Sequence, residues 1–135
     1  MANAYWLLKS EPEKYSWDDL VRDGSTVWDG VRNNQAALYL KAMKTGDEAL
    51  IYHSQSDKAV VGRARVTDQA FIDPSDPAGR FVAVKIAPIA PLKRPVSLAE
   101  LRAELPQMLI FRQFRLSVTP LISDERDRIV KLGGG

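Results

Sequence analysis

The amino-acid sequence predicts an α+β domain, in which a small and strongly bent sheet or barrel is flanked by short helices. About five or six short segments have the alternating or wholly apolar pattern of strands, and helix-like patterns lie between them. No repeat or linker divides the 135 residues, whose length suits one domain. We therefore expect residues 1–135 to form a single domain, with residues 133–135 as a flexible glycine tail.

The first elements are predicted from an apolar run and a helix cap. Residues 4–9 are aromatic and apolar, which is typical of a buried strand. Ser16 precedes a short acidic helix start and fits an N-cap, and Gly24 fits the helix end. Residues 26–28 form a short β-prone segment that leads into the central stretch of the chain.

A helix is predicted from Gln35 to Met43, because Ala36, Leu40 and Met43 recur on one helical face. A turn at residues 44–47 should follow this helix. The mostly apolar residues 48–53 should then form the next strand.

The middle of the chain predicts antiparallel strands. The polar residues 55–58 suit a hairpin turn, and residues 59–66 alternate as a strand with one wet face does. Gly62 within that strand indicates a bulge or a close backbone approach. Residues 73–79 form a loop by composition, and residues 81–86 alternate again.

The last third mixes helices with an extended connection punctuated by Pro88, Pro91 and Pro95. Residues 97–100 fit a capping box, so a helix of about two turns should end before Pro106. The pattern of residues 109–114 predicts neither a helix nor a strand. The remaining predictions are a closing strand over residues 115–119 and a final helix capped by Ser123, over residues 124–132.

Composition excludes several kinds of site. Cysteine is absent, so neither a disulfide framework nor a thiolate zinc site can form. One histidine excludes a multi-histidine metal site within one chain. A net charge of +2 is small for a protein that grips long duplexes through phosphates. We expect no metal and no cofactor.

Composition also bears on the compartment. No run of about 18 apolar residues is present, so we expect no membrane partner. The first residues lack the basic and apolar regions of a signal peptide. We expect a cytoplasmic monomer.

Two polar clusters at the ends of the predicted helix 35–43 hold most of the candidate site residues. Trp28, Arg32 and Asn33 precede the helix, and residues 52–54 (Tyr-His-Ser) follow it. An aromatic plate beside fixed donors and acceptors suits a flat ligand such as a nucleobase. Trp28 can equally be a packing residue, and Asn33 can simply be the N-cap of the helix.

Catalytic arrangements find less support in the sequence. His53 and Ser54 are adjacent on a predicted strand and point to opposite faces, so they are poorly placed as base and nucleophile. A hydrolase built on Lys9, Glu11 and a nearby hydroxyl is conceivable, although no spacing rule supports it. We therefore expect a protein that is not an enzyme.

Seven motifs follow one another along the chain, at residues 5–12, 28–36, 43–47, 52–54, 61–62, 95–98 and 115–118. In this order they resemble the EVE-domain family, including its stand-alone bacterial members and the eukaryotic thymocyte nuclear protein 1 group. The likeness covers about residues 5–132. Departures occur at Ala37-Leu38, where many relatives have Arg-Asn, and in the loops 55–58 and 73–79.

This resemblance implies a PUA-like fold, a small mixed β-barrel with helices around it, and kinship with domains that read a methylated adenine in RNA. It also implies a reader of modified bases, in particular modified cytosines in DNA, with the base turned out into a pocket. RNA remains an alternative partner.

The resemblance further implies which residues of this chain form the pocket. Arg32 or Arg115 would contact a flanking phosphate. The implied ligand-binding residues are Trp28, Val31, Arg32, Asn33, Tyr52, His53, Ser54, Leu116 and Ser117, and the implied rim or phosphate contacts are Lys9, Ser10, Glu11 and Arg115.

Two other functions stay open at this point. One is a small hydrolase that acts on modified nucleosides, as some relatives in the wider PUA-like group are. The other is a module that binds a small metabolite or a protein partner, with no role for nucleic acid.

Overall fold

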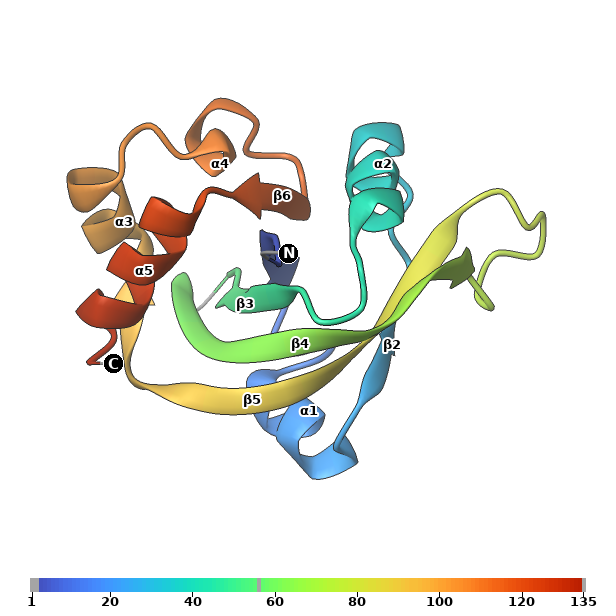
Figure 1. Cartoon of the computed structure of the whole chain (residues 1–135), viewed down its shortest axis with the longest axis horizontal. Helices are drawn as coiled ribbons and strands as arrows, with labels where there is room; N and C mark the ends of the chain where they lie inside the picture. Colours follow the sequence, from blue (N-terminus) through green and yellow to red (C-terminus); the bar gives the residue numbers. More distant parts are fainter. Residues whose placement is uncertain (1–2, 56, 135) are drawn as a thin grey trace.

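The computed structural model describes residues 3–55 and 57–134. Its centre is one six-stranded sheet in the order β2-β5-β4-β3-β1-β6, with helices packed around it (Figure 1). The strands are β1 (Tyr5–Ser10), β2 (Thr26–Trp28), β3 (Glu48–His53), β4 (Ala59–Ile72), β5 (Val82–Ser97) and β6 (Val118–Leu121). The helices are α1 (Trp17–Asp23), α2 (Asn34–Ala42), α3 (Leu98–Glu104), α4 (Leu109–Arg112) and α5 (Ser123–Leu132).

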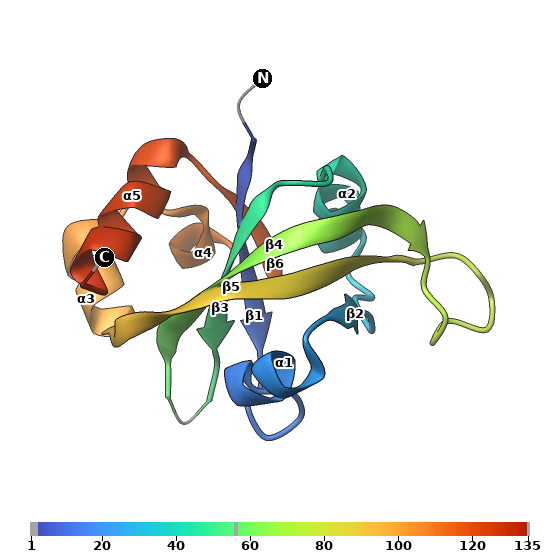
Figure 2. The ribbon, with the colours of Figure 1, turned by 60° about the horizontal axis from the view of Figure 1, so that its bottom comes forward.

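The sheet is mixed and strongly bent, so the predicted α+β class and PUA-like architecture are confirmed. β1 pairs with β3 in parallel, whereas the other neighbouring strands are antiparallel. β2 and β6 stand at opposite ends of the strand order, and no ladder joins them in the described part of the chain. The long strands β4 and β5 curve across the molecule and give the sheet its barrel-like shape (Figures 1 and 2).

Each face of the sheet carries its own hydrophobic core, because successive strand residues point to opposite faces. Trp6 and Leu8 of β1 belong to the core that α1 and α2 cover. Leu7, between them, belongs to the second core, which α3, α4 and α5 cover. In Figure 1 these three helices gather at one end of the molecule, apart from α1 and α2.

Helix caps follow the sequence predictions closely at two helices. Ser16 caps α1 through a reciprocal pair of hydrogen bonds with Asp19, and Gly24 ends the helix with φ 75°. Ser97 and Glu100 form the predicted capping box of α3. These local bonds fix where the chain turns between strand and helix.

Gly62 marks a close approach, as predicted, at a register shift of β4 against β5. A Cβ built at Gly62 would lie 2.6 Å from the indole ring of Trp17. Side-chain atoms do not approach so closely, so the backbone of β4 serves as the floor for the first residue of α1. This packing sets the position of α1 against the sheet.

The two long strands are longer than predicted, and the proline-rich connection is itself part of β5. β4 continues to Ile72, six residues beyond the predicted end at Val66, and β5 runs through all three prolines. β2 pairs with β5 only at Val84–Ile86. One edge of β5 is therefore free of a partner strand beyond that point, which allows prolines without a lost ladder bond.

The C-terminal elements also differ in their bounds. The unassigned stretch contains the single-turn helix α4, and β6 begins at Val118 and includes Pro120. Pro120 is tolerated because β6 is an edge strand. Ser123 is the first helical residue of α5 and not its cap, since Ile122 takes that position and its N–H donates to Glu125.

The first residue of the predicted glycine tail, Gly133, contacts β5. Gly133 is buried, and its carbonyl oxygen accepts a hydrogen bond from the backbone N–H of Arg94 at 3.1 Å. A Cβ there would lie 2.9 Å from Leu92. Gly134 is exposed, and Gly135 lies outside the described residues.

Candidate functional site

One pocket lies between the end of β1 and β2, and it brings together two segments that the sequence analysis singled out. Its volume is about 630 Å³, within the range of roughly 300–1,000 Å³ that small-molecule sites have. The lining combines polar, aromatic and apolar residues. It consists of Lys9, Ser10, Glu11, Lys14, Tyr15, Thr26, Val27, Trp28, Asp29, Gly30, Val31, Arg32 and Ser117.

The curl of the sheet explains why these segments meet. β1 and β2 stand four places apart in the strand order, yet Trp28 of β2 and Leu8 of β1 share one hydrophobic core. α1 connects the two strands along the chain. The pocket therefore opens where the barrel is not closed by a strand ladder.

Two aromatic side chains stand together in the pocket wall. The rings of Trp28 and Tyr15 make an edge-to-face contact, with centroids 6.3 Å apart and planes at 86°. Trp28 is 9% exposed, so it is at once a core residue and a pocket residue. The hydroxyl of Tyr15 donates to Asp23, and burial raises the pKa of Tyr15, so its phenol stays neutral at physiological pH.

A turn from Gly30 to Arg32 forms another part of the lining, and a buried carboxylate fixes it. Gly30 has φ 78°, a conformation that other residues adopt at a cost, and its N–H donates to Asp73 at 2.8 Å. The Arg32 guanidinium donates to the same carboxylate at 2.9 Å and to Ser75 at 3.1 Å. The loop after β4 thus fixes the turn through Asp73 and Ser75.

Asp73 is fully buried and ionised. Burial opposes its charge, but hydrogen bonds from Ser75, Arg32 and the Gly30 backbone outweigh this and hold the pKa of Asp73 well below its usual range. Ser75 donates twice, from its N–H and its hydroxyl, each at 2.7 Å. Sequence analysis placed Asp73 only in a variable loop and missed this role.

The end of β1 supplies the third side of the pocket. Lys9 donates through its ammonium to the carbonyl of Phe114, and its backbone N–H donates to Ser117 at 2.9 Å. Partial burial lowers the pKa of Lys9. The hydroxyl of Ser10 donates to the carbonyl of Tyr15, which ties β1 to the start of α1.

The second predicted cluster, Tyr52-His53-Ser54, does not line this pocket. Tyr52 belongs to the hydrophobic core on the other face of the sheet. It lies two residues after Leu50 on β3, so both side chains point to that face. Ser54 donates to the Ser10 carbonyl, and it supports the β1 end from behind.

His53 has a structural role next to the pocket. Its Nε2 accepts the backbone N–H of Trp17 at 2.9 Å, and its Nδ1 lies 2.7 Å from Asp57. A backbone amide can only donate, so Nδ1 carries the proton that Asp57 accepts. His53 thereby fixes the first turn of α1, which follows the pocket residue Tyr15.

Three more of the predicted site residues, Asn33, Leu116 and Arg115, do not line the pocket. The side-chain oxygen of Asn33 accepts the backbone N–H of Ala36 at 3.0 Å and caps α2. Its contacts are therefore those of a helix N-cap. Leu116 is buried in the core. Arg115 is exposed outside the pocket lining, next to Leu116.

Several lining residues were not predicted. Tyr15 and Thr26 carried little local signal, although Tyr15 immediately precedes the Ser16 cap and therefore stands where the chain turns. Asp29 and Gly30 lie inside a motif that the sequence analysis quoted without assigning them a role. Lys14 forms an ion pair with Glu11 at 3.5 Å on the rim.

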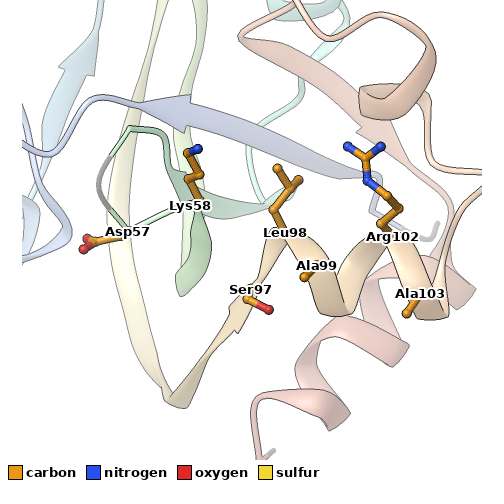
Figure 3. A pocket seen from close by; sticks show the side chains of 7 residues that line it. All are labelled: Asp57, Lys58, Ser97, Leu98, Ala99, Arg102 and Ala103. Carbon is orange, nitrogen blue, oxygen red and sulfur yellow. The ribbon is translucent and has the colours of Figure 1, made fainter.

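A second, shallower depression lies elsewhere, where the end of β5 and the start of α3 meet the β3–β4 turn (Figure 3). Leu98, Ala99 and Ala103 give it an apolar surface, and Lys58 and Arg102 stand beside it. It shares no residue with the pocket between β1 and β2. No aromatic side chain is among the described residues that line it, so it has no ring on which a flat ligand could stack.

The comparison with protein families decides the relationship. The family model described as EVE domain matches residues 4–132. The chain belongs to the EVE-domain family. The pocket is therefore a feature of an EVE domain, as the motifs in the sequence indicated.

Relatives and solved structures agree with this placement. Human thymocyte nuclear protein 1 is 32% identical over 96% of this chain and 74% of its own length. The solution structure of Rpa0253 from Rhodopseudomonas palustris is 44% identical, with TM-score 0.91, over 97% of this EVE domain and 93% of that chain. Human THYN1, crystallised with 5-methylcytosine-containing DNA, is 31% identical, with TM-score 0.90, over 98% and 99%.

The described residues of the EVE domain offer neither a metal site nor a membrane-spanning helix. No group of three or more His, Asp or Glu side chains is placed to hold a metal ion between residues 3 and 134, residue 56 aside. In the same part of the chain, every helix is too short or too polar to span a bilayer.

Proposed function

We propose that this protein is a non-catalytic reader that binds a turned-out modified base, in particular a modified cytosine in DNA, in the pocket between β1 and β2. The observation that carries the proposal is the convergence of Lys9–Glu11, Trp28–Arg32 and Ser117 in one pocket. A similar fold has been crystallised with 5-methylcytosine-containing DNA, which supports the choice of partner.

The lining suits a pyrimidine with an added methyl group. A turned-out base would stack against the aromatic wall of Trp28 and Tyr15, an interaction worth about 1–3 kcal/mol. Glu11 and Asp29 can accept hydrogen bonds from the amino group of cytosine, as carboxylates do in groove recognition. Val27 and Val31 supply apolar surface for a methyl group.

The charges around the pocket suit a short stretch of strand. Three cations, Lys9, Lys14 and Arg32, and two acids, Glu11 and Asp29, line it. Arg32 is 39% exposed while bound to Asp73, so its remaining donors can face a phosphate. Few phosphates would be engaged, and binding should therefore weaken only modestly with salt.

The expected result is a preference for one modified base. Duplexes that differ only in cytosine or 5-methylcytosine at one position should bind with dissociation constants about fourfold apart, since one buried methyl contributes about 0.8 kcal/mol. Fluorescence anisotropy titrations measure the ratio, with an RNA strand containing 5-methylcytidine as a second arm. Equal affinity for all the strands would contradict the proposal.

One observation favours a second candidate, a hydrolase of modified nucleosides. Lys9, Glu11 and Thr26 share the pocket, so an amine, a carboxylate and a hydroxyl stand within one cavity. The Lys9 ammonium is engaged by the Phe114 carbonyl, which favours a structural role. Product formation from modified nucleosides that ceases in Lys9→Ala would favour the hydrolase.

A further inference from the structure

The segment between α4 and β6 presents an aromatic ring to solvent next to Lys9 of the pocket lining. Residues 112–115 (Arg-Gln-Phe-Arg) are all exposed, and the Phe114 side chain is 54% exposed. The residues on either side of Phe114 therefore give it no apolar cover. A single exposed apolar side chain is ordinary in a soluble protein. A role for Phe114 therefore has to be inferred from the residues around it.

Phe114 is fixed in place by a pocket residue. The Lys9 ammonium lies 4.4 Å from the centroid of the Phe114 ring and also donates to the Phe114 carbonyl. Leu116 anchors the segment in the core, and Ser117 accepts the backbone N–H of Lys9 at 2.9 Å. Lys9 and Ser117 both line the pocket, and Phe114 itself does not, so the ring lies next to the lining residue Lys9 and outside the pocket.

The charge around the ring suits a nucleic acid strand. Residues 109–118 contain no acidic residue, and Arg112 and Arg115 flank Phe114 at a distance of two and one positions. An aromatic ring among cations matches stacked bases between phosphates, which is how many proteins hold an opened strand. Apolar side chains also enter base stacks as wedges.

We propose that Phe114 is a wedge that enters the duplex stack at the place that the modified base leaves. This inference rests on the function proposed above, because the wedge stabilises a base pair opened for the pocket. The ring replaces stacking lost when the base turns out, while Arg112 and Arg115 contact the neighbouring phosphates. Single-stranded substrates, whose bases are already unstacked, gain little from the wedge.

The experiment compares duplex with single strand. Phe114→Ala should weaken binding to a duplex with one 5-methylcytosine about tenfold, and binding to the matching single strand less than twofold. Phe114→Trp should retain duplex binding. Ile122→Ala removes an equally exposed side chain from the turn before α5 and should change neither affinity. Thermal unfolding of each variant verifies the fold.

A fluorescent base provides a second readout. Wild-type protein should raise the emission of 2-aminopurine placed next to 5-methylcytosine in the duplex, because an opened pair leaves its neighbour partly unstacked. Phe114→Ala should raise it less at equal occupancy, because fewer pairs stay open without the wedge. Equal weakening of duplex and single strand, or no weakening, would overturn the wedge and leave the pocket function standing. Loss of the preference for 5-methylcytosine in wild-type protein would overturn both.

Discussion

Replacing Asp73 with asparagine should lower the free energy of unfolding by about 3 kcal/mol at neutral pH, since three partner groups lose a charged acceptor at about 1 kcal/mol each. The groups are the Gly30 N–H, the Arg32 guanidinium and Ser75. The Arg32 contribution is the smallest, because its guanidinium is partly exposed to water. Urea unfolding of both proteins measures the difference.

The pH dependence of this difference has a defined sign. The pKa of Asp73 is lower in the folded than in the unfolded chain, so its contribution is present above the unfolded value of about 4 and is lost as pH falls below it. The gap between wild type and Asp73→Asn should therefore begin to narrow below about pH 5 and keep narrowing as pH falls toward the much lower pKa of the folded state.

An exposed carboxylate provides the matched control for Asp73. Asp68→Asn changes an exposed side chain on β4 and should alter stability by less than about 0.5 kcal/mol. If Asp73→Asn and Asp68→Asn behaved alike, the buried network would not hold the pocket turn. Asp73→Asn should also weaken binding of 5-methylcytosine DNA, because Gly30 and Arg32 lose their support.

The second large effect is expected at Trp28. Trp28→Leu keeps an apolar side chain in the core but removes the ring on which a base would stack. Binding to a 5-methylcytosine duplex should weaken about tenfold, which corresponds to about 1.4 kcal/mol of lost stacking. Isothermal titration at a temperature well below the unfolding transition measures it.

Trp6→Leu separates binding from stability. Trp6 belongs to the same core as Trp28, and its indole N–H donates to the buried Asp47 at 2.9 Å, but it does not line the pocket. Both variants should lose stability, because each removes a buried ring. Only Trp28→Leu should lose affinity, and an equal loss in both would remove Trp28 from the site.

Strand periodicity explains why the Tyr52-His53-Ser54 cluster, which the family resemblance implied as ligand-binding, does not line the pocket. Tyr52, His53 and Ser54 are adjacent, so no single pocket on one face of the sheet can hold all three side chains. The apolar residue Leu50 shares its face with Tyr52 and marks that face as core. The same alternation that excludes a His53–Ser54 catalytic pair also excludes this cluster as one wall.

Long-range contacts explain what the sequence could not predict. The Trp28-to-Arg32 stretch lines the pocket as a motif indicated, but its support by Asp73 spans more than 40 positions. Nothing local distinguishes Asp73 from Asp76, the other acid of its loop. The path of β5 through three prolines was missed for a similar reason, because a free strand edge is a property of the sheet.

Strands and helices with strong local signals were predicted well. Ser16, Gly24 and Ser97 mark helix ends through bonds made within a few residues, so the sequence alone indicates them. The single-turn helix α4 has neither a side-chain cap nor enough length for a period. Its position follows from packing on the second core through Ile110.

The most direct measurement is the NMR spectrum of the three indole N–H groups during titration with a 5-methylcytosine oligonucleotide. Trp28 lines the pocket, whereas Trp6 and Trp17 are buried core residues that serve as internal references. We expect the Trp28 resonance to shift with the modified strand and to shift less with the unmodified strand at equal concentration. The Trp6 resonance should stay unchanged. A Trp28 resonance that ignores the modified base would contradict it.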